Sequence, residues 1–312
     1  MNKFMPEGSL LATEENYSYL RNLESLEKAM RDNASLEATA ILCDHKLNLH
    51  VDLGEGIRGI IPKDEIIYPC FGKDPKDIAI LTRVGKAVVF KILEINKCAG
   101  GETVAVLSRK AAQKECYEKY VTNLNRGDII PSRVTHIEPF GAFVDIGCGI
   151  IALLSIDSIS VSRISHPTDR LQVGDKIFSV VKEIDECGRV FVSERELLGT
   201  WEENASLFNE GETVCGIIRS IESYGIFVEL KPNLAGLAEY RENLSIGQTV
   251  TVYIKSIIPE KMKIKLIIID PYSESSFDAP LEYFVDTQKI QHLDSWIYSP
   301  NRCNKTIATF FN

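Results

Sequence analysis

The chain has 312 residues, 45% of them hydrophobic and 25% charged, so it is long enough for two or three domains and too apolar for wholesale disorder. Its net charge of −9 argues by composition against a nucleic-acid partner, because proteins that neutralise phosphates are usually basic, although a small binding face can differ from the remaining surface. The acidic start fits neither a secretory signal nor a transit peptide, and no apolar run approaches the length of a membrane span.

The cysteine pattern indicates no disulfide framework and no metal site. The eight cysteines form no CxxC pair and have no metal-ligand spacing with histidine. Reduced and mostly buried thiols are the ordinary interpretation of such scattered cysteines. We therefore expect a cytoplasmic protein without a membrane partner, a metal or another cofactor.

In chain order, the pattern begins as a helix and then repeats one β-rich unit three times. In the first segment, Leu20, Leu23 and Leu26 recur at three-residue spacing, which predicts a helix. The predicted parts are an N-terminal helical segment (1–32), a first barrel (33–110), a linker helix (111–125), a second barrel (126–196), a linker (197–208), a third barrel (209–270) and a C-terminal extension packed on the third barrel (271–312).

The repeat rests on landmarks that recur in the same order. "VDLG" (Val51–Gly54), "VDIG" (Val144–Gly147) and "VELK" (Val228–Lys231) mark equivalent points. Each is followed by a glycine-containing turn into a strand and by a closing β-rich run, such as "RVFVSER" in the second unit. Five short β-rich segments with glycine-bearing turns predict a small closed β-barrel, so the fold class is mainly β with three tandem barrels.

Strand alternation places one aromatic residue of the second and third units outside the core. Ala142, Val144 and Ile146 share the inward face, so Phe143 points outward beside Asp145. The same parity places Phe227 outward beside Glu229 in the third unit, whereas the first unit has His50 at this position. Phe140 and Tyr224 would face inward by parity, although a bulge at the following glycine would redirect them outward.

An outward aromatic residue on a barrel has two interpretations. It can pack beneath a loop or a neighbouring barrel, or it can form a platform on which an unpaired base stacks, worth roughly 1–3 kcal/mol per base. Recurrence in two units favours the platform. The basic residues on nearby strands that could hold phosphates are Arg133, Arg189 and Arg195 in the second unit and Arg219, Lys255, Lys263 and Lys265 in the third.

These stretches resemble a known family. "RGDIIPSRVTHIEPFGAFVDIG" and "VGDKIFSVVKEIDECGRVFVSER" look like the two halves of the S-one (S1) RNA-binding domain, a five-stranded barrel of the oligonucleotide-binding (OB) type, repeated as in the ribosomal protein S-one family. The stretch from Gly199 to Glu239 resembles the short form of Gram-positive bacteria. The resemblance covers about residues 33 to 270 and is weaker for the first unit.

The resemblance also implies an RNA-contact pattern of two aromatics, a histidine, and an aspartate four residues before a basic residue. The second unit matches it with Phe140, Phe143, Asp185 and Arg189, and has Ser155 in place of the histidine. The third unit matches with Tyr224, Phe227 and Lys263, and has Glu239 and Pro259 in place of the histidine and the aspartate. The first unit matches at none of the five places.

The resemblance therefore implies a non-catalytic protein that captures single-stranded messenger RNA on its second and third barrels. Delivery to the small ribosomal subunit, with the first barrel as the docking module, is implied by analogy with the family. The alternative is a scaffold or regulatory protein whose barrels bind proteins, which the net charge favours. An enzyme is disfavoured because the sequence has no phosphate-binding loop, nucleophile elbow or HExxH motif.

Overall fold

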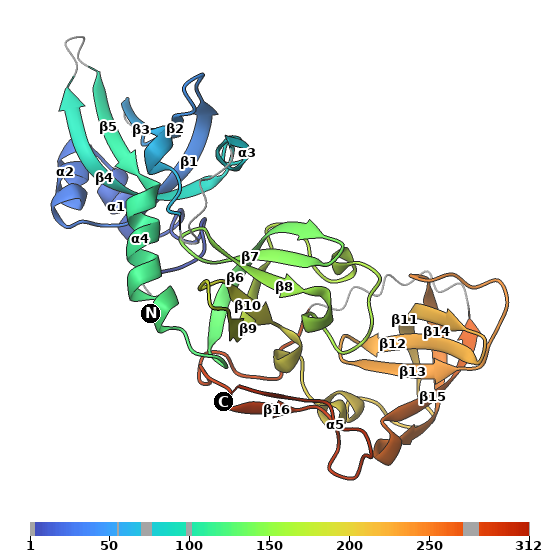
Figure 1. Ribbon diagram of the computed structural model, residues 1–312. Helices are drawn as coiled ribbons and strands as arrows, with labels where there is room; N and C mark the ends of the chain where they lie inside the picture. The colour runs from blue at the N-terminus through green and yellow to red at the C-terminus, as the bar shows by residue number, and fades with distance from the viewer. Residues whose placement is uncertain (1–3, 55, 70–76, 98–101, 271–280, 312) are drawn as a thin grey trace.

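The computed structural model describes residues 4–54, 56–69, 77–97, 102–270 and 281–311. Its strands form three closed five-stranded barrels arranged one after another along the chain (Figure 1). In each barrel the third strand pairs in parallel with the fifth, and the remaining neighbours that the structure describes run antiparallel. The predicted fold class, mainly β with three tandem OB-type barrels, is confirmed.

The strands of the first barrel are β1 (Leu36–Cys43), β2 (Leu49–Asp52), β3 (Ile57–Ile61), β4 (Ala87–Lys97) and β5 (Thr103–Ser108). Those of the second are β6 (Ile129–Glu138), β7 (Gly141–Gly147), β8 (Ile150–Ser155), β9 (Lys176–Ile184) and β10 (Val190–Ser193). Those of the third are β11 (Thr213–Glu222), β12 (Gly225–Lys231), β13 (Leu234–Ala238), β14 (Thr249–Ile258) and β15 (Lys263–Asp270).

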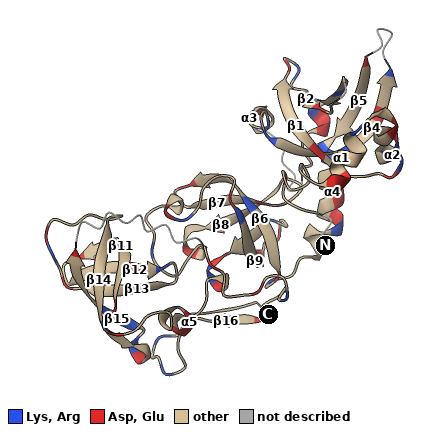
Figure 2. Cartoon of the chain, turned by 180° about the vertical axis from the view of Figure 1, so that it is seen from behind, with Lys and Arg blue, Asp and Glu red and all other residues tan. Residues whose placement is uncertain are grey.

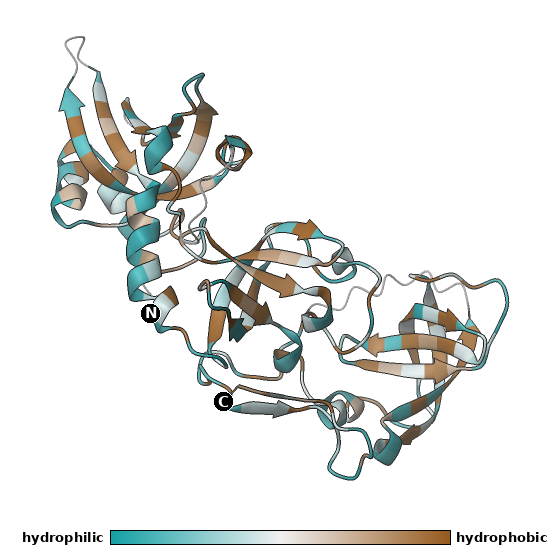
Figure 3. Ribbon diagram, in the orientation of Figure 1, coloured by the Kyte–Doolittle hydropathy of each residue, from teal (hydrophilic) through white to brown (hydrophobic). Residues whose placement is uncertain are grey.

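The barrel interiors are filled by every second residue of each strand, as Figure 3 shows by the alternating colours along the arrows. Ala142, Val144 and Ile146 of β7 are fully buried. Ile226 and Val228 of β12 are fully buried as well. Burial of an aliphatic side chain of this size contributes roughly 1.5–3 kcal/mol. Strand parity therefore orients the outward residues between them, which include Phe143 and Phe227.

The helices are short and join or flank the barrels. They are α1 (Glu14–Leu20), α2 (Leu23–Arg31), α3 (Asp77–Leu81), α4 (Arg109–Lys119) and α5 (Trp201–Ala205), with 3-10 turns η1 (Lys63–Glu65), η2 (Val121–Asn123), η3 (Ile156–Ser158), η4 (Pro167–Asp169), η5 (Arg195–Leu197) and η6 (Pro259–Lys261). The expected N-terminal helix is divided in two, because the Asn22 side chain caps a new helix by accepting the Ser25 N–H. No helix in the described ranges is long and apolar enough to cross a membrane.

The C-terminal extension packs on two barrels rather than on the third alone. Its strands β16 (Ser295–Ile297) and β17 (Ala308–Phe310) pair antiparallel and lie beneath the second and third barrels in Figure 1. Trp296 and Tyr298 join the core of the third barrel, whereas Phe311 and Tyr283 pack with residues of the second. The extension thus ties the two barrels together; its first predicted residues, 271–280, lie outside the described ranges.

Candidate nucleic-acid interface

The hairpin between β6 and β7 carries the first aromatic pair. Phe140 and Phe143 meet edge to face, with ring centroids 6.0 Å apart and an interplanar angle of 89°. Phe140 is 54% exposed, and Phe143 is half-buried on the outer side of β7. The edge-to-face geometry holds the two rings at right angles, with Phe140 as the more exposed ring of the pair.

The turn that exposes Phe140 depends on Gly141. A Cβ at this position would lie 2.4 Å from the carbonyl oxygen of Leu154 on the neighbouring strand, so only glycine allows this approach. The expected bulge is present, but it lies on the preceding strand, between Val134 and His136, and not at the glycine. Phe140 is exposed because it belongs to the hairpin turn, outside the alternation of the strands.

The third barrel repeats this arrangement. Tyr224 and Phe227 meet edge to face at 6.2 Å and 88°, and Tyr224 is 67% exposed. A Cβ on Gly225 would lie 2.6 Å from the carbonyl oxygen of Ala238, which is the same constraint as in the second barrel. Two barrels therefore present the same perpendicular aromatic pair from the same hairpin.

A histidine that the sequence interpretation missed adds to the second barrel. His136 lies opposite Phe143 in the register and stacks on it, with ring centroids 6.1 Å apart and an interplanar angle of 21°. Its imidazole is hydrogen-bonded to Glu138 at 2.8 Å. The bulge after Val134 reverses the parity of β6, so simple alternation would have placed His136 inside. The third barrel has Ser220 at this position.

The predicted Asp185–Arg189 pair is formed at the hairpin that joins β9 to β10. Arg189 Nε lies 2.7 Å from Asp185 Oδ2, and the Arg189 side chain is 60% exposed. Partial burial acts to raise the pKa of Asp185. The backbone N–H groups of Arg189 and Cys187 and the Arg189 guanidinium nevertheless hold this pKa below its ordinary value. The carboxylate thus orients a cation whose outer N–H groups remain open to a phosphate.

The equivalent hairpin of the third barrel lacks this carboxylate. Lys263 lies opposite Ile258, so Ile258, and not Pro259, occupies the structural place of Asp185, and the turn between them is one residue longer. Lys255 and Lys263 are exposed and form no ion pair within the described ranges. In the second barrel, Ser155 ends β8 opposite Gly141, and its hydroxyl donates to that of Ser158 at 2.9 Å.

Three of the proposed phosphate contacts are used inside the protein. Arg133 donates to the Glu7 carbonyl at 2.8 Å, and Arg219 binds Glu229 and is nearly buried. Arg195 donates to the Asp157 carbonyl, to the Thr309 hydroxyl and to Glu196, and its guanidinium lies 5.9 Å from the Trp296 ring centroid. These three arginines therefore have partners within the protein, whereas Arg189, Lys255 and Lys263 have exposed side chains.

The two carboxylates expected beside the outward phenylalanines are also not in solvent. Asp145 is 2% exposed and Glu229 is 1% exposed, because other parts of the chain cover them. Burial, together with the nearby Glu7 carboxylate, raises the pKa of Asp145 to about 7. The outward face of the second barrel and that of the third thus each divide into an open aromatic part and a covered acidic part.

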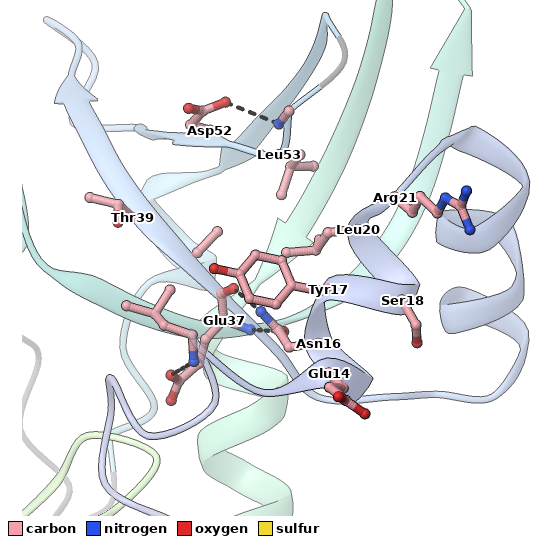
Figure 4. Close-up of a pocket in the computed structure, with 13 residues that line it drawn as sticks. Glu14, Asn16, Tyr17, Ser18, Leu20, Arg21, Glu37, Thr39, Asp52 and Leu53 are labelled. Atoms are coloured by element: carbon pink, nitrogen blue, oxygen red, sulfur yellow. Dashed lines mark hydrogen bonds between the residues drawn. The ribbon is translucent and has the colours of Figure 1, made fainter.

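The first barrel has no aromatic pair at this place. His50 lies opposite Leu42 and Ile60 and contacts Asp44 at 3.4 Å, so its imidazole is flanked by aliphatic residues. A cavity of about 870 Å³ lies elsewhere on this barrel, where Tyr17 and Asn16 of α1 face Glu37 of β1 (Figure 4). Its polar groups hold α1 in place, since the Asn16 side chain binds the backbone of Glu37 in both directions.

Figure 2 shows Lys and Arg segments on β15. In the described part of the chain, no group of three or more His, Cys, Asp or Glu residues is arranged to hold a metal ion. The arrangement can therefore bind by stacking and by contact with phosphates, which are the two interactions that single-stranded nucleic acids offer without base pairing.

Comparison with known proteins finds one family and several relatives. Residues 123–195 match the S1 RNA binding domain family. The chain is 28% identical over 280 residues to the small ribosomal subunit protein bS1 of Staphylococcus saprophyticus, covering 84% of this chain and 67% of the relative. The bS1 protein of Staphylococcus aureus is 28% identical over 277 residues, covering 83% of this chain and 66% of the relative. The chain thus spans about two thirds of the length of these relatives, and the resemblance found in the sequence is confirmed.

Among solved structures, a multidomain protein with nucleic acid binding domains from Streptococcus pneumoniae is 15% identical and has a TM-score of 0.26. The match covers 79% of this chain and 76% of that chain.

Proposed function

We propose that this chain, which resembles the S1 family, binds single-stranded RNA on its second and third barrels and captures messenger RNA for the small ribosomal subunit without catalysing a reaction. The observation that carries the proposal is the recurrence of one perpendicular aromatic pair, Phe140–Phe143 and Tyr224–Phe227, on the same hairpin of two barrels.

The geometry favours unpaired over paired RNA. A base can stack on an exposed ring only when its own face is free, which a duplex prevents, and each such stack contributes roughly 1–3 kcal/mol. Arg189 in the second barrel and Lys263 in the third supply cations at the hairpin of the last strand, where a phosphate next to a stacked base can lie. Stacking and backbone contact together recognise RNA with only modest sequence preference.

The first barrel has a different proposed role, as the part that contacts the small ribosomal subunit in the cytoplasm. Its residues at the place of the aromatic pair are aliphatic or paired, with Leu42 and Ile60 beside His50. An apolar surface of this kind suits a protein contact better than it suits RNA. The same observation supports the second candidate function, a scaffold in which all three barrels bind proteins.

Titration of labelled RNA distinguishes the two functions. A single-stranded oligoadenylate of about 20 nucleotides, longer than the 4–16 that one barrel covers, and its duplex with oligouridylate are titrated into the full chain. We expect the single strand to bind more tightly, and Phe143→Ala with Phe227→Ala to lower its affinity by about 30-fold or more.

Tyr17→Ala is the matched control, because Tyr17 is 65% exposed on α1 and lies away from both aromatic pairs. Equal binding by the double variant and the wild type would refute the stacking platforms. Absence of RNA binding by the wild type would favour the scaffold.

A further inference from the structure

A third outward phenylalanine lies in line with the aromatic pair of the second barrel. The register places Phe143 of β7 opposite Leu153 of β8, and Leu153 opposite Phe191 of β10. Phe191 is half-buried between Val190 and Val192, which are both buried in the barrel interior. Because neighbouring strands lie about 4.8 Å apart, the backbones at Phe143 and Phe191 are separated by about 10 Å across the outer face.

The third barrel has a lysine at the same position. Phe227 of β12 lies opposite Leu237 of β13, and Leu237 lies opposite Lys265 of β15. Lys265 is exposed, and the residues on either side of it, Ile264 and Leu266, are buried. The two barrels therefore share one frame, aromatic then leucine, and differ in the residue on the far side of the leucine.

The residues around Phe191 carry a negative charge, whereas those around Lys265 carry positive charges. In the second barrel, Phe191 lies opposite the exposed Glu183 of β9, and the nearby Arg189 shares its charge with Asp185. In the third barrel, Lys265 lies opposite the uncharged Ser256 of β14. Lys255 and Lys263 are exposed on the same two strands, and within the described ranges these three lysines form no ion pair.

This inference rests on the proposed function: we infer that the two barrels differ in the chemical group of the RNA strand, base or phosphate, that they contact in addition to the bases stacked on their aromatic pairs. Both barrels stack bases on their aromatic pairs, and each adds a different contact. The second barrel adds a base contact, with Phe191 as an additional stacking residue next to Phe143. The third barrel adds a phosphate contact, with Lys265 next to Phe227. An aromatic ring beside a carboxylate favours the uncharged face of a base, whereas unpaired lysines favour the backbone.

The test uses two substitutions and two probes on the full chain. Phe191→Leu keeps an apolar side chain on the outer face but removes the ring, and Lys265→Gln keeps the length of the side chain but removes the charge. The probes are a labelled single-stranded oligoadenylate of about 20 nucleotides and the same strand with abasic sites throughout, each titrated over a range of salt concentrations.

We expect Phe191→Leu to weaken binding of oligoadenylate by about 5- to 150-fold at every salt concentration, with an unchanged salt slope and no effect on the abasic strand. We expect Lys265→Gln to make the salt slope of log K against log salt shallower by about 0.7 for both strands. Lys261→Gln, on the exposed turn before β15, is the matched control and should leave both quantities unchanged.

The outcomes separate this inference from the proposed function. If Phe143→Ala with Phe227→Ala weakens binding but Phe191→Leu binds oligoadenylate as the wild type does, the role of Phe191 is wrong and the function stands. If both substitutions change the salt slope equally, the division between barrels is wrong. If Phe143→Ala with Phe227→Ala has no effect, the proposed function itself fails.

Discussion

Asp145 of the second barrel and Glu229 of the third occupy the same strand position, two residues after the outward phenylalanine, and both are buried against the part of the chain that precedes their barrel. Asp145 accepts the backbone N–H of Glu7 at 2.7 Å. Glu229 accepts from Arg170, which follows the η4 turn of the second barrel, and from Arg219. The second and third barrels thus contact the part of the chain that precedes them through the same strand position.

This repeated joint leaves the aromatic hairpins open. The covered carboxylate and the half-buried phenylalanine lie two residues apart on one outward face, and the exposed aromatic residue lies in the adjoining hairpin turn, so the contact between units leaves the hairpin end of that face to a ligand. At the first joint, Glu7 also binds the fully buried Arg109, with Nε–Oε1 and Nη2–Oε2 distances of 2.6 and 2.9 Å. Burial opposes ionisation of Glu7, but Arg109 holds its pKa below the ordinary value.

Glu229→Gln is expected to destabilise the joint between the second and third barrels. The substitution leaves the side chains of Arg170 and Arg219, which are 6% and 8% exposed, without their shared carboxylate. Removal of one partner of a buried pair costs about 3–5 kcal/mol. Urea denaturation measures the loss, and Glu222→Gln at the exposed end of β11 is the control. Loss of less than about 1 kcal/mol would contradict a structural role for this cluster.

Glu194→Gln is expected to change how stability depends on pH. Burial raises the pKa of Glu194 to about 8, and the carboxyl accepts the Tyr283 hydroxyl at 2.8 Å. The unfolded pKa is about 4.3, so the native state binds this proton more tightly, and the stabilisation is lost as pH rises from about 4.3 to 8. The amide keeps the contact and does not titrate.

The free energy of unfolding measured across this range should therefore fall less steeply for Glu194→Gln, by up to about 1.4 kcal/mol per pH unit. Arg170 lowers and Asp175 raises the pKa of the same carboxyl, and both residues are present in the variant as well as in the wild type. Parallel pH profiles of the variant and the wild type would show that Glu194 does not titrate in this range.

Gly141→Ala is expected to affect both stability and RNA binding. Its Cβ would lie 2.4 Å from the backbone oxygen of Leu154, so β7 and β8 must separate, at a cost of about 1–3 kcal/mol. The shift also displaces the hairpin that carries Phe140. Gly54→Ala is the comparison, since its Cβ would meet nothing within 4 Å and the positive φ of 76° alone costs about 1–2 kcal/mol. If Gly141→Ala bound RNA as tightly as the wild type, the close approach of Gly141 to Leu154 would not be needed to position the hairpin.

Arg189→Lys is expected to separate orientation from charge. Lysine keeps the positive charge but loses the fixed contact with Asp185, so RNA affinity should fall by no more than about fivefold with the same salt slope. Arg189→Gln should also make the salt slope shallower by about 0.7. Anisotropy titrations at several salt concentrations measure both. Identical behaviour of the two variants would show that the charge makes no contact with phosphate.

Several features of the fold and site were predictable because they are local. The alternation around Phe143 and Phe227 and the order of landmarks predicted the three barrels and the outward rings, which the structure contains. His136 was missed because a bulge in β6 reverses its parity, and no residue type marks that bulge in the sequence. The N-terminal helix was predicted as one because a helix cap at Asn22 interrupts the pattern without a glycine or proline.

By itself, the sequence determined the repeat, the barrel class and the direction of the strand side chains where no bulge interrupts the strand, because a strand reverses its side chains every second residue regardless of distant contacts. Only the tertiary structure decided which outward residues meet solvent. Asp145, Arg133 and Arg195 point away from their cores, yet Glu7 and Thr309, more than 100 residues away in sequence, take up their hydrogen bonds. Such burial arises from packing between units. The two-residue period of a strand gives the direction of a side chain but does not predict which distant segment covers it.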